Sequence, residues 1–247
     1  MVLGARTLED KGEVLVLEST DKLRWTHINT LTTPEPFGYM WECPDLFCLD
    51  GQWYLAVSPQ GIQCQNVYGC GYFPIYGDWR RDCILGDFYH ADFGFDYYAP
   101  QSFTDETGRR IQIGWMGMPD AAYGNAATVA YGWQHCMTVP RELTAGAGGV
   151  VLQQPAREIE RHYASVRVGE SSLEVAGDTC FDVVVDGVDG AFTATVDGEL
   201  KLAFVLAEGE LPSRFEMRFT DEGRASAGCG RTVRCLLYTS PSPRDCS

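Results

Sequence analysis

Hydrophobic residues recur along this chain in short runs that turn residues separate. The apolar run 14–17 is followed by Ser-Thr-Asp, and the run 46–49 is followed by Asp50-Gly51 and then by a second run, 53–57. Short apolar or alternating runs around an Asp-Gly turn are typical of β-hairpins. Helical periodicity is almost absent, and 27 Gly and 12 Pro punctuate the sequence. The pattern therefore predicts an all-β protein.

Two of the predicted hairpins share one layout. Residues 44–57 and residues 100–116 each contain an aromatic-bearing strand, a turn with an acidic residue and Gly, and a strand that carries Trp. Repeated antiparallel units of this kind are typical of β-propeller blades. A β-sandwich also has short strands and tight turns, so the pattern alone leaves both architectures open.

The pattern changes near residue 150, which predicts a second domain. Shorter and more regular alternations follow a connector, at 181–186, 191–196, 200–206 and 214–219. They predict a β-sandwich with too few strands to be complete. We expect four segments: a first β domain at 1–152, a linker at 153–163, a partial β-sandwich at 164–234, and a tail at 235–247. The tail resembles translated adaptor sequence and is excluded from the fold prediction.

Composition narrows the classes of function. The chain has 45% hydrophobic and 21% charged residues, as globular proteins do, and a net charge of −15. Such an acidic balance argues against a nucleic-acid partner, and no apolar run is long enough for a membrane-spanning helix. The ten cysteines show no Cys-x-x-Cys spacing, so we expect no metal. The N-terminal sequence has no signal-peptide pattern, which favours a reduced, cytoplasmic protein.

The strongest chemical candidate is Glu42, in the segment Trp41-Glu42-Cys43-Pro44-Asp45. This carboxyl lies between Trp and Cys and just before an apolar strand. Such surroundings disfavour the charged form and can keep a carboxyl protonated, as a general acid requires. Taken alone, a Glu at the start of a strand is more often an ordinary surface group.

The wider segment adds weight to Glu42. Glu-Cys-Pro-Asp-Leu-Phe resembles the acid/base motif of glycoside hydrolase family 32, which includes invertases, fructanases and sucrose-6-phosphate hydrolases. Three later segments resemble motifs of the same family in the same order: Gly94-Phe-Asp-Tyr-Tyr-Ala-Pro-Gln-Ser-Phe103, Gly108-Arg-Arg-Ile-Gln-Ile-Gly-Trp-Met-Gly117 and Gly132-Trp-Gln-His-Cys-Met-Thr-Val-Pro-Arg-Glu-Leu143. The segments Gly94–Phe103 and Gly132–Leu143 look most like the bacterial sucrose-6-phosphate hydrolases. The resemblance covers about residues 1–165 well and the second domain only loosely.

The resemblance implies a fold and a reaction. Residues 1–152 are then the later blades of a five-bladed β-propeller, followed by a truncated β-sandwich. The implied activity is retaining hydrolysis of a terminal β-fructofuranoside without a cofactor, on sucrose, sucrose 6-phosphate or fructan. Glu42 is the implied acid/base.

Four further residues are predicted to bind substrate. Tyr98 matches the family's Tyr-Ala position and is predicted to hydrogen-bond the acid/base carboxyl or the substrate, with strand packing as the alternative. Asn66 is a candidate polar contact, or an ordinary turn residue. Trp115 and Trp41 are predicted to stack on sugar faces, although Trp in the core of a blade is at least as common.

The chain also departs from the family pattern. Family members carry an Asn-Asp-Pro nucleophile segment and an Arg-Asp-Pro segment before the Glu-Cys motif, and the 41 residues before Glu42 contain neither. We therefore expect an N-terminally truncated fragment that is inactive by itself. Two alternatives stay open: a non-catalytic carbohydrate-binding propeller, and a secreted invertase or fructanase whose signal peptide lies in the missing part.

Overall fold

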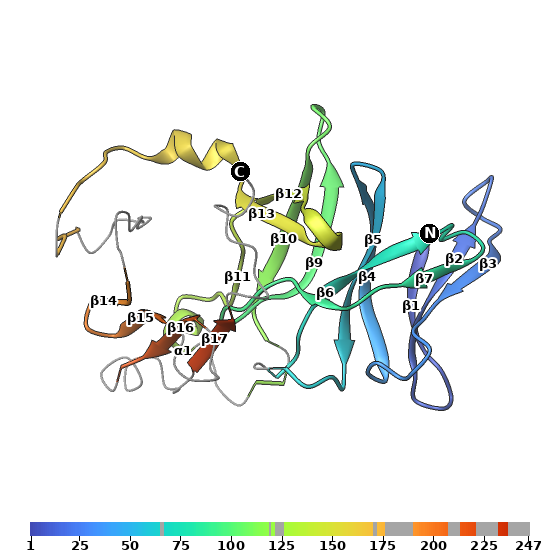
Figure 1. Cartoon of the computed structure of the whole chain (residues 1–247), viewed down its shortest axis with the longest axis horizontal. Helices are drawn as coiled ribbons and strands as arrows, with labels where there is room; N and C mark the ends of the chain where they lie inside the picture. The colour runs from blue at the N-terminus through green and yellow to red at the C-terminus, as the bar shows by residue number, and fades with distance from the viewer. Residues whose placement is uncertain are drawn as a thin grey trace.

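The computed structural model describes residues 1–64, 67–118, 120–121, 126–169, 172–175, 190–206, 213–220 and 232–236. Strands carry the fold over these ranges (Figure 1). The helical segments are short: α1 (Ala126–Val129), η1 (Ala147–Gly149) and η2 (Arg157–His162). The predicted all-β class is confirmed. Over the same ranges, no helix is long and apolar enough to cross a membrane.

The strands form antiparallel sheets that follow one another along the chain. The first sheet contains β1 (Val2–Arg6), β2 (Gly12–Glu18) and β3 (Thr26–Leu31). The second contains β4 (Met40–Leu49), β5 (Gln52–Gln60), β6 (Gly71–Gly77), β7 (Cys83–Leu85) and β8 (Tyr89–His90). The third contains β9 (Tyr98–Thr104), β10 (Arg110–Met116), β11 (Cys136–Met137), β12 (Arg141–Ala145) and β13 (Val151–Pro155). The fourth contains β14 (Phe192–Val196), β15 (Leu200–Val205), β16 (Arg214–Phe219) and β17 (Thr232–Leu236).

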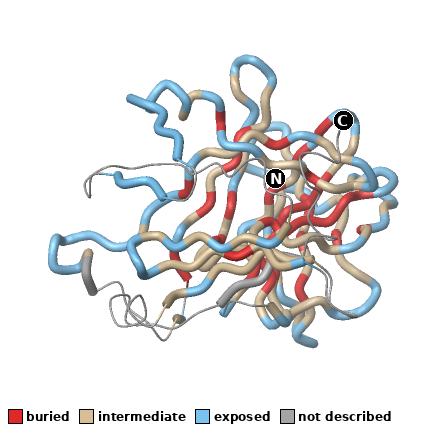
Figure 2. Tube along the Cα trace, turned by 60° about the vertical axis from the view of Figure 1, so that its left-hand side comes forward, coloured by how far each residue is buried: buried red, intermediate tan, exposed pale blue. Residues whose placement is uncertain are grey.

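The second sheet lies between the first and the third and is buried on both faces. Side chains alternate along a strand, so Leu55 and Val57 of β5 face one way and Tyr54 and Ala56 the other. One core cluster joins Leu55 and Val57 to residues of the first sheet, and another joins Tyr54 and Ala56 to Leu143 of the third. Figure 2 shows that buried stretches of the chain gather within the body of the molecule. Each large apolar side chain buried there contributes about 1.5–3 kcal/mol.

The first strands of three successive sheets, β1, β4 and β9, lie side by side. β1 approaches β4 so closely that a Cβ on Gly4 would lie 2.0 Å from the carbonyl oxygen of Trp41, which explains the glycine. On the other side of β4, the Gln101 amide of β9 donates a hydrogen bond to the carbonyl oxygen of Cys43 at 2.9 Å. This arrangement brings side chains from different sheets to one place.

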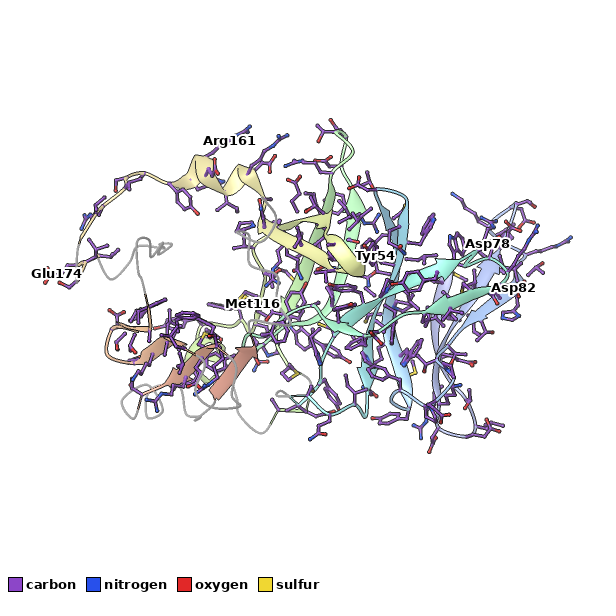
Figure 3. The ribbon with its side chains drawn as sticks, in the orientation of Figure 1. Tyr54, Asp78, Asp82, Met116, Arg161 and Glu174 are labelled. Carbon is purple, nitrogen blue, oxygen red and sulfur yellow. The ribbon has the colours of Figure 1, made fainter. Side chains whose placement is uncertain are left out.

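The later part of the chain agrees with the predicted strands where it is described. β14, β15 and β16 fall on the predicted alternations, whereas the run 181–186 lies outside the described residues. β13 extends to Pro155, beyond the predicted boundary at 152, and β17 includes Cys235 and Leu236, which were assigned to the tail. η2 and the described segment at 172–175 lie away from the sheets, as Arg161 and Glu174 show in Figure 3.

Candidate active site

Glu42 lies at a β-bulge in β4. It pairs with Ser58 of β5, whereas Asp45 pairs with Ala56, so three steps along β4 match two along β5. Cys43, within the bulge, has φ +49°, a conformation that is strained for a residue with a Cβ. In a regular strand Glu42 and Asp45 would point to opposite faces. The extra residue puts both on the face that is directed at the third sheet.

Tyr98 occupies the corresponding position in β9. It pairs with Trp115 of β10, whereas Gln101 pairs with Ile113, so this strand has a bulge of the same size. Ala99 also has φ +49°, and a proline follows it, as Pro44 follows Cys43. Glu42 and Tyr98 are therefore equivalent residues of two adjacent, similarly bulged strands.

The two equivalent side chains meet. The Tyr98 hydroxyl donates a hydrogen bond to Oε2 of Glu42 at 2.6 Å. Tyr98 is buried, and burial together with this hydrogen bond raises its pKa far above the usual value for tyrosine. The phenol therefore keeps its proton and acts as a donor. The structure thus places Tyr98 where it can orient the half-buried Glu42 carboxyl.

An aromatic wall continues from Tyr98. The Trp115 ring meets the Tyr98 ring edge-on at 6.5 Å, and the Tyr68 ring lies tilted at 5.8 Å from the Tyr98 ring. His135 contacts Trp115 at 4.9 Å, and the Tyr68 hydroxyl donates to Asp120. Trp115 is partly exposed, so its ring is accessible to a sugar, and the sugar contact of Trp115 stays a prediction. The sequence analysis did not predict Tyr68 and His135 as site residues. The signal in the sequence that could have pointed to them is their nearness to Asn66 and Trp133.

The structure contradicts the predicted sugar contact of Trp41. Its side chain has 0% exposure, stacks on Phe73 at 5.3 Å and donates its indole N–H to the carbonyl oxygen of Phe37. The reason is strand alternation: Trp41 precedes Glu42 and points to the opposite face, into the core shared with the first sheet. Asn66 lies outside the described residues.

Asp45 links the two bulged strands rather than facing a substrate. Arg110 of β10 donates to Oδ1 at 3.1 Å, and the Ser102 backbone N–H and hydroxyl both donate to Oδ2. Burial raises the pKa of the Asp45 carboxyl, and the bonds from Ser102 and Arg110 offset part of that rise. Because both oxygens are engaged, Asp45 is poorly placed to act as a second catalytic carboxylate.

A cavity of about 320 Å³ adjoins Tyr68, within the size range of small-molecule sites. Its lining includes Cys70, His90, Asp92 and Tyr97. Asp92 is ion-paired with Arg141 at 2.7 Å, and burial lowers the pKa of His90, which favours a neutral imidazole. Across the described ranges, no three His, Cys, Asp or Glu side chains gather in a way suited to a metal ion.

Comparison with known proteins identifies the class. Residues 1–155 match the glycosyl hydrolases family 32 N-terminal domain. The chain therefore belongs to glycoside hydrolase family 32, as its four motifs indicated.

The relatives it matches are longer than this chain. It is 34% identical over 229 residues to sucrose-6-phosphate hydrolase of Bacillus subtilis, covering 85% of this chain and 48% of that protein. It is 41% identical over 169 residues to sucrose-6-phosphate hydrolase of Staphylococcus xylosus, covering 65% and 33%. The solved sucrose-6-phosphate hydrolase of Lactobacillus gasseri shares 21% identity with a TM-score of 0.71, covering 96% of this chain and 51% of that structure. The chain thus spans about half, or less, of these relatives, and its sheets match part of a family propeller structure.

Proposed function

We propose that this chain supplies the general acid/base side of a retaining β-fructofuranosidase site that releases fructose from sucrose 6-phosphate or sucrose. The observation that carries the proposal is the 2.6 Å hydrogen bond from Tyr98 to Glu42, at equivalent bulges within the region that matches the family. The names of the Bacillus and Staphylococcus relatives favour the phosphorylated sugar as substrate.

Glu42 serves two steps in this proposal. Its carboxyl first protonates the glycosidic oxygen as the sugar leaves, and the resulting carboxylate then takes a proton from the attacking water. Tyr98 holds Oε2 throughout, because its raised pKa keeps it a donor, so the catalytic proton leaves and returns through Oε1. Trp115 and the aromatic wall then bound the sugar site beside the carboxyl.

A retaining mechanism needs a second carboxylate about 5 Å from the first. Among the described carboxylates of the site and the adjoining cavity, Asp45 is held by Arg110 and Ser102, Asp92 is paired with Arg141, and Asp120 accepts the Tyr68 hydroxyl. Each is engaged by a side chain of this chain, which argues against a nucleophile among them. We therefore propose that the nucleophile belongs to a segment outside this chain, and that the 247-residue polypeptide alone releases no fructose.

The test is an assay of two proteins with sucrose 6-phosphate, sucrose and a fructan. One is the purified chain, for which we expect no turnover. The other is a fusion in which the N-terminal part of the Bacillus relative precedes residues 1–247, for which we expect fructose release. In the fusion, Glu42→Gln should lower kcat by about 10²–10⁴-fold, because a general acid/base contributes on that order.

Two results would contradict the proposal. Fructose release by the purified chain would overturn the prediction that it lacks its nucleophile. An E42Q fusion with unchanged kcat would remove Glu42 from catalysis, and sugar binding without turnover would then favour a carbohydrate-binding module.

A further inference from the structure

The cross-strand partner of Glu42 is a buried residue that the proposed mechanism does not use. Ser58 pairs with Glu42 in the β4–β5 ladder and has 0% exposure. Its hydroxyl is buried without a hydrogen-bond partner among the described residues. Buried hydroxyls nearly always have a partner, since leaving one unpaired costs free energy, so an unpaired one calls for a functional explanation.

Ser58 and Glu42 point to the same side of the sheet. Directly paired residues of antiparallel strands share a face, with their Cβ atoms about 4.5–5.5 Å apart. That face also carries Tyr54 and Ala56, which pack against Leu143 of the third sheet. The Ser58 hydroxyl is therefore sealed from solvent, on the side where Tyr98 reaches Glu42.

Over the residues that the structure describes, the Glu42 carboxyl accepts one hydrogen bond, at Oε2 from the Tyr98 hydroxyl. Oε1 is then the oxygen open to a donor on the paired residue, Ser58. The corresponding pair in the third sheet is Tyr98 and Trp115, so of these two equivalent pairs the one that contains the acid carries a small hydroxyl residue. A donor is useful there because a carboxylate that has lost its proton accepts hydrogen bonds more strongly than a neutral carboxyl.

We propose that Ser58 is a positioning residue for Glu42: its hydroxyl donates a hydrogen bond to the oxygen that Tyr98 leaves free, in the ionised state that follows proton donation. The proton involved stays on Ser58, and no bond other than the hydrogen bond forms. This inference rests on the acid/base role proposed for Glu42. Ser58 and Tyr98 then hold the carboxylate from two sides while it activates water.

The test follows the Glu42 carboxyl directly in the full chain. The side-chain carboxyl carbons of glutamate are labelled with ¹³C, the Glu42 resonance is assigned with E42Q, and its position is measured against pH. Cys43, Tyr68 and Tyr98 face Glu42, and the pKa of each is raised, so none of these three titrates in the acidic range. Asp45 lies on the same face and is ion-paired with Arg110, so Ser102→Ala, which removes a donor from Asp45, reports what a change at Asp45 does to Glu42.

In Ser58→Ala, we expect the midpoint of the pH-dependent change of the Glu42 resonance to lie about one pH unit higher than in the wild type. This corresponds to a tenfold change in proton binding. Ser58→Thr, which keeps a hydroxyl, should return the transition toward the wild-type pH. Ser102→Ala is the matched control, because that hydroxyl serves Asp45 in the same pair of strands. It should leave the Glu42 transition where it is.

If the Glu42 transition in S58A lies at the wild-type pH, the inference is overturned. A higher melting temperature of the same variant would then show that the Ser58 hydroxyl is a buried group without a hydrogen-bond partner and without a role at Glu42. An equal shift in S102A also overturns the inference, because the effect would then be a general loosening of the strands. The acid/base role is tested separately by E42Q in the fusion. If that variant keeps its kcat while S58A moves the resonance, the hydrogen bond stands and the proposed function fails.

Discussion

The hairpins β4–β5 and β9–β10 use one backbone device for two kinds of chemistry. In each, a residue at φ +49° followed by proline makes a bulge in the first strand, and the residue before it points toward the neighbouring sheet. That residue is an acid in one hairpin and a phenol in the other, and the two form a hydrogen bond. The repeat thus fixes where side chains point, while their identity determines what they do.

The hairpins differ in what supports the bulge. Glu42 is paired with the small, buried Ser58, and Tyr98 is paired with the large, partly exposed Trp115. The first arrangement keeps water and bulk away from one side of the carboxyl. The second gives the phenol an aromatic neighbour that extends outward. The difference teaches that one position of the repeat can carry the proposed proton donor in one sheet and a phenol with an aromatic neighbour in the next.

The largest effect is expected from separating the two hairpins at the ion pair between Arg110 of β10 and Asp45 of β4. Both side chains are mostly buried, at 16% and 10% exposure. Arg110→Met leaves the Asp45 carboxylate buried without its cation, which should lower the free energy of unfolding by about 3–5 kcal/mol. Urea unfolding followed by tryptophan fluorescence measures this loss.

The control is an exposed pair in the first sheet. Arg6 and Asp10 have side-chain exposures of 50% and 63%, so Arg6→Met should cost about 0–1 kcal/mol. The double variant R110M/D45N should recover part of the stability lost by R110M, because the stranded charge is then gone. If R110M costs no more than R6M, the ion pair does not join the two hairpins.

A smaller loss is expected from removing the contact between the equivalent residues themselves. Tyr98→Phe keeps the ring but removes the hydrogen bond to Glu42, and an intramolecular hydrogen bond contributes about 0.5–1.5 kcal/mol. In the fusion, Y98F should also lower kcat more than it changes KM. Tyr97→Phe is the matched control: it removes the neighbouring hydroxyl, which donates to Gln112 rather than to Glu42. A kcat of Y98F equal to that of Y97F would show that Tyr98 does not orient the acid.

These contacts mark the limit of what the sequence could predict. Alternation and turns that contain an acidic residue and Gly were enough for the hairpins, and the family resemblance pointed to Glu42 and Tyr98. The bulges depend on register with β5 and β10, and the Arg110–Asp45 pair joins residues 65 positions apart. Neither follows from local pattern. Trp41 shows the converse, since the alternation that predicted the strand already places it on the face opposite Glu42, toward the core.

The equivalence of the bulges is sharpened by two glycine variants of small effect. A residue with a Cβ at φ +49° is strained by about 1–2 kcal/mol, and glycine relieves the strain but loses about 0.5–1 kcal/mol through chain entropy. Cys43→Gly and Ala99→Gly should therefore each stabilise the chain by up to about 1 kcal/mol. Differential scanning calorimetry of both variants checks whether the gains agree. If one variant is stabilised and the other is destabilised, the two bulges are supported differently.

The smallest effect concerns the turns of the two hairpins and appears only in acid. Burial acts against it, but hydrogen bonds from Thr107 and Arg109 lower the pKa of Asp105 in the β9–β10 turn to about 2. A carboxyl whose pKa is lowered by folding adds stability above its unfolded pKa, and that stability is lost as pH falls from about 4 toward 2. Asp105→Asn should remove this part of the acid sensitivity, seen as a smaller drop in melting temperature between pH 5 and pH 2.5. Asp50→Asn, in the β4–β5 turn, is the matched control and should keep the wild-type drop. Equal drops in D105N and the wild type would show that the two turns respond to acid alike, so that the hairpins differ only at their bulges.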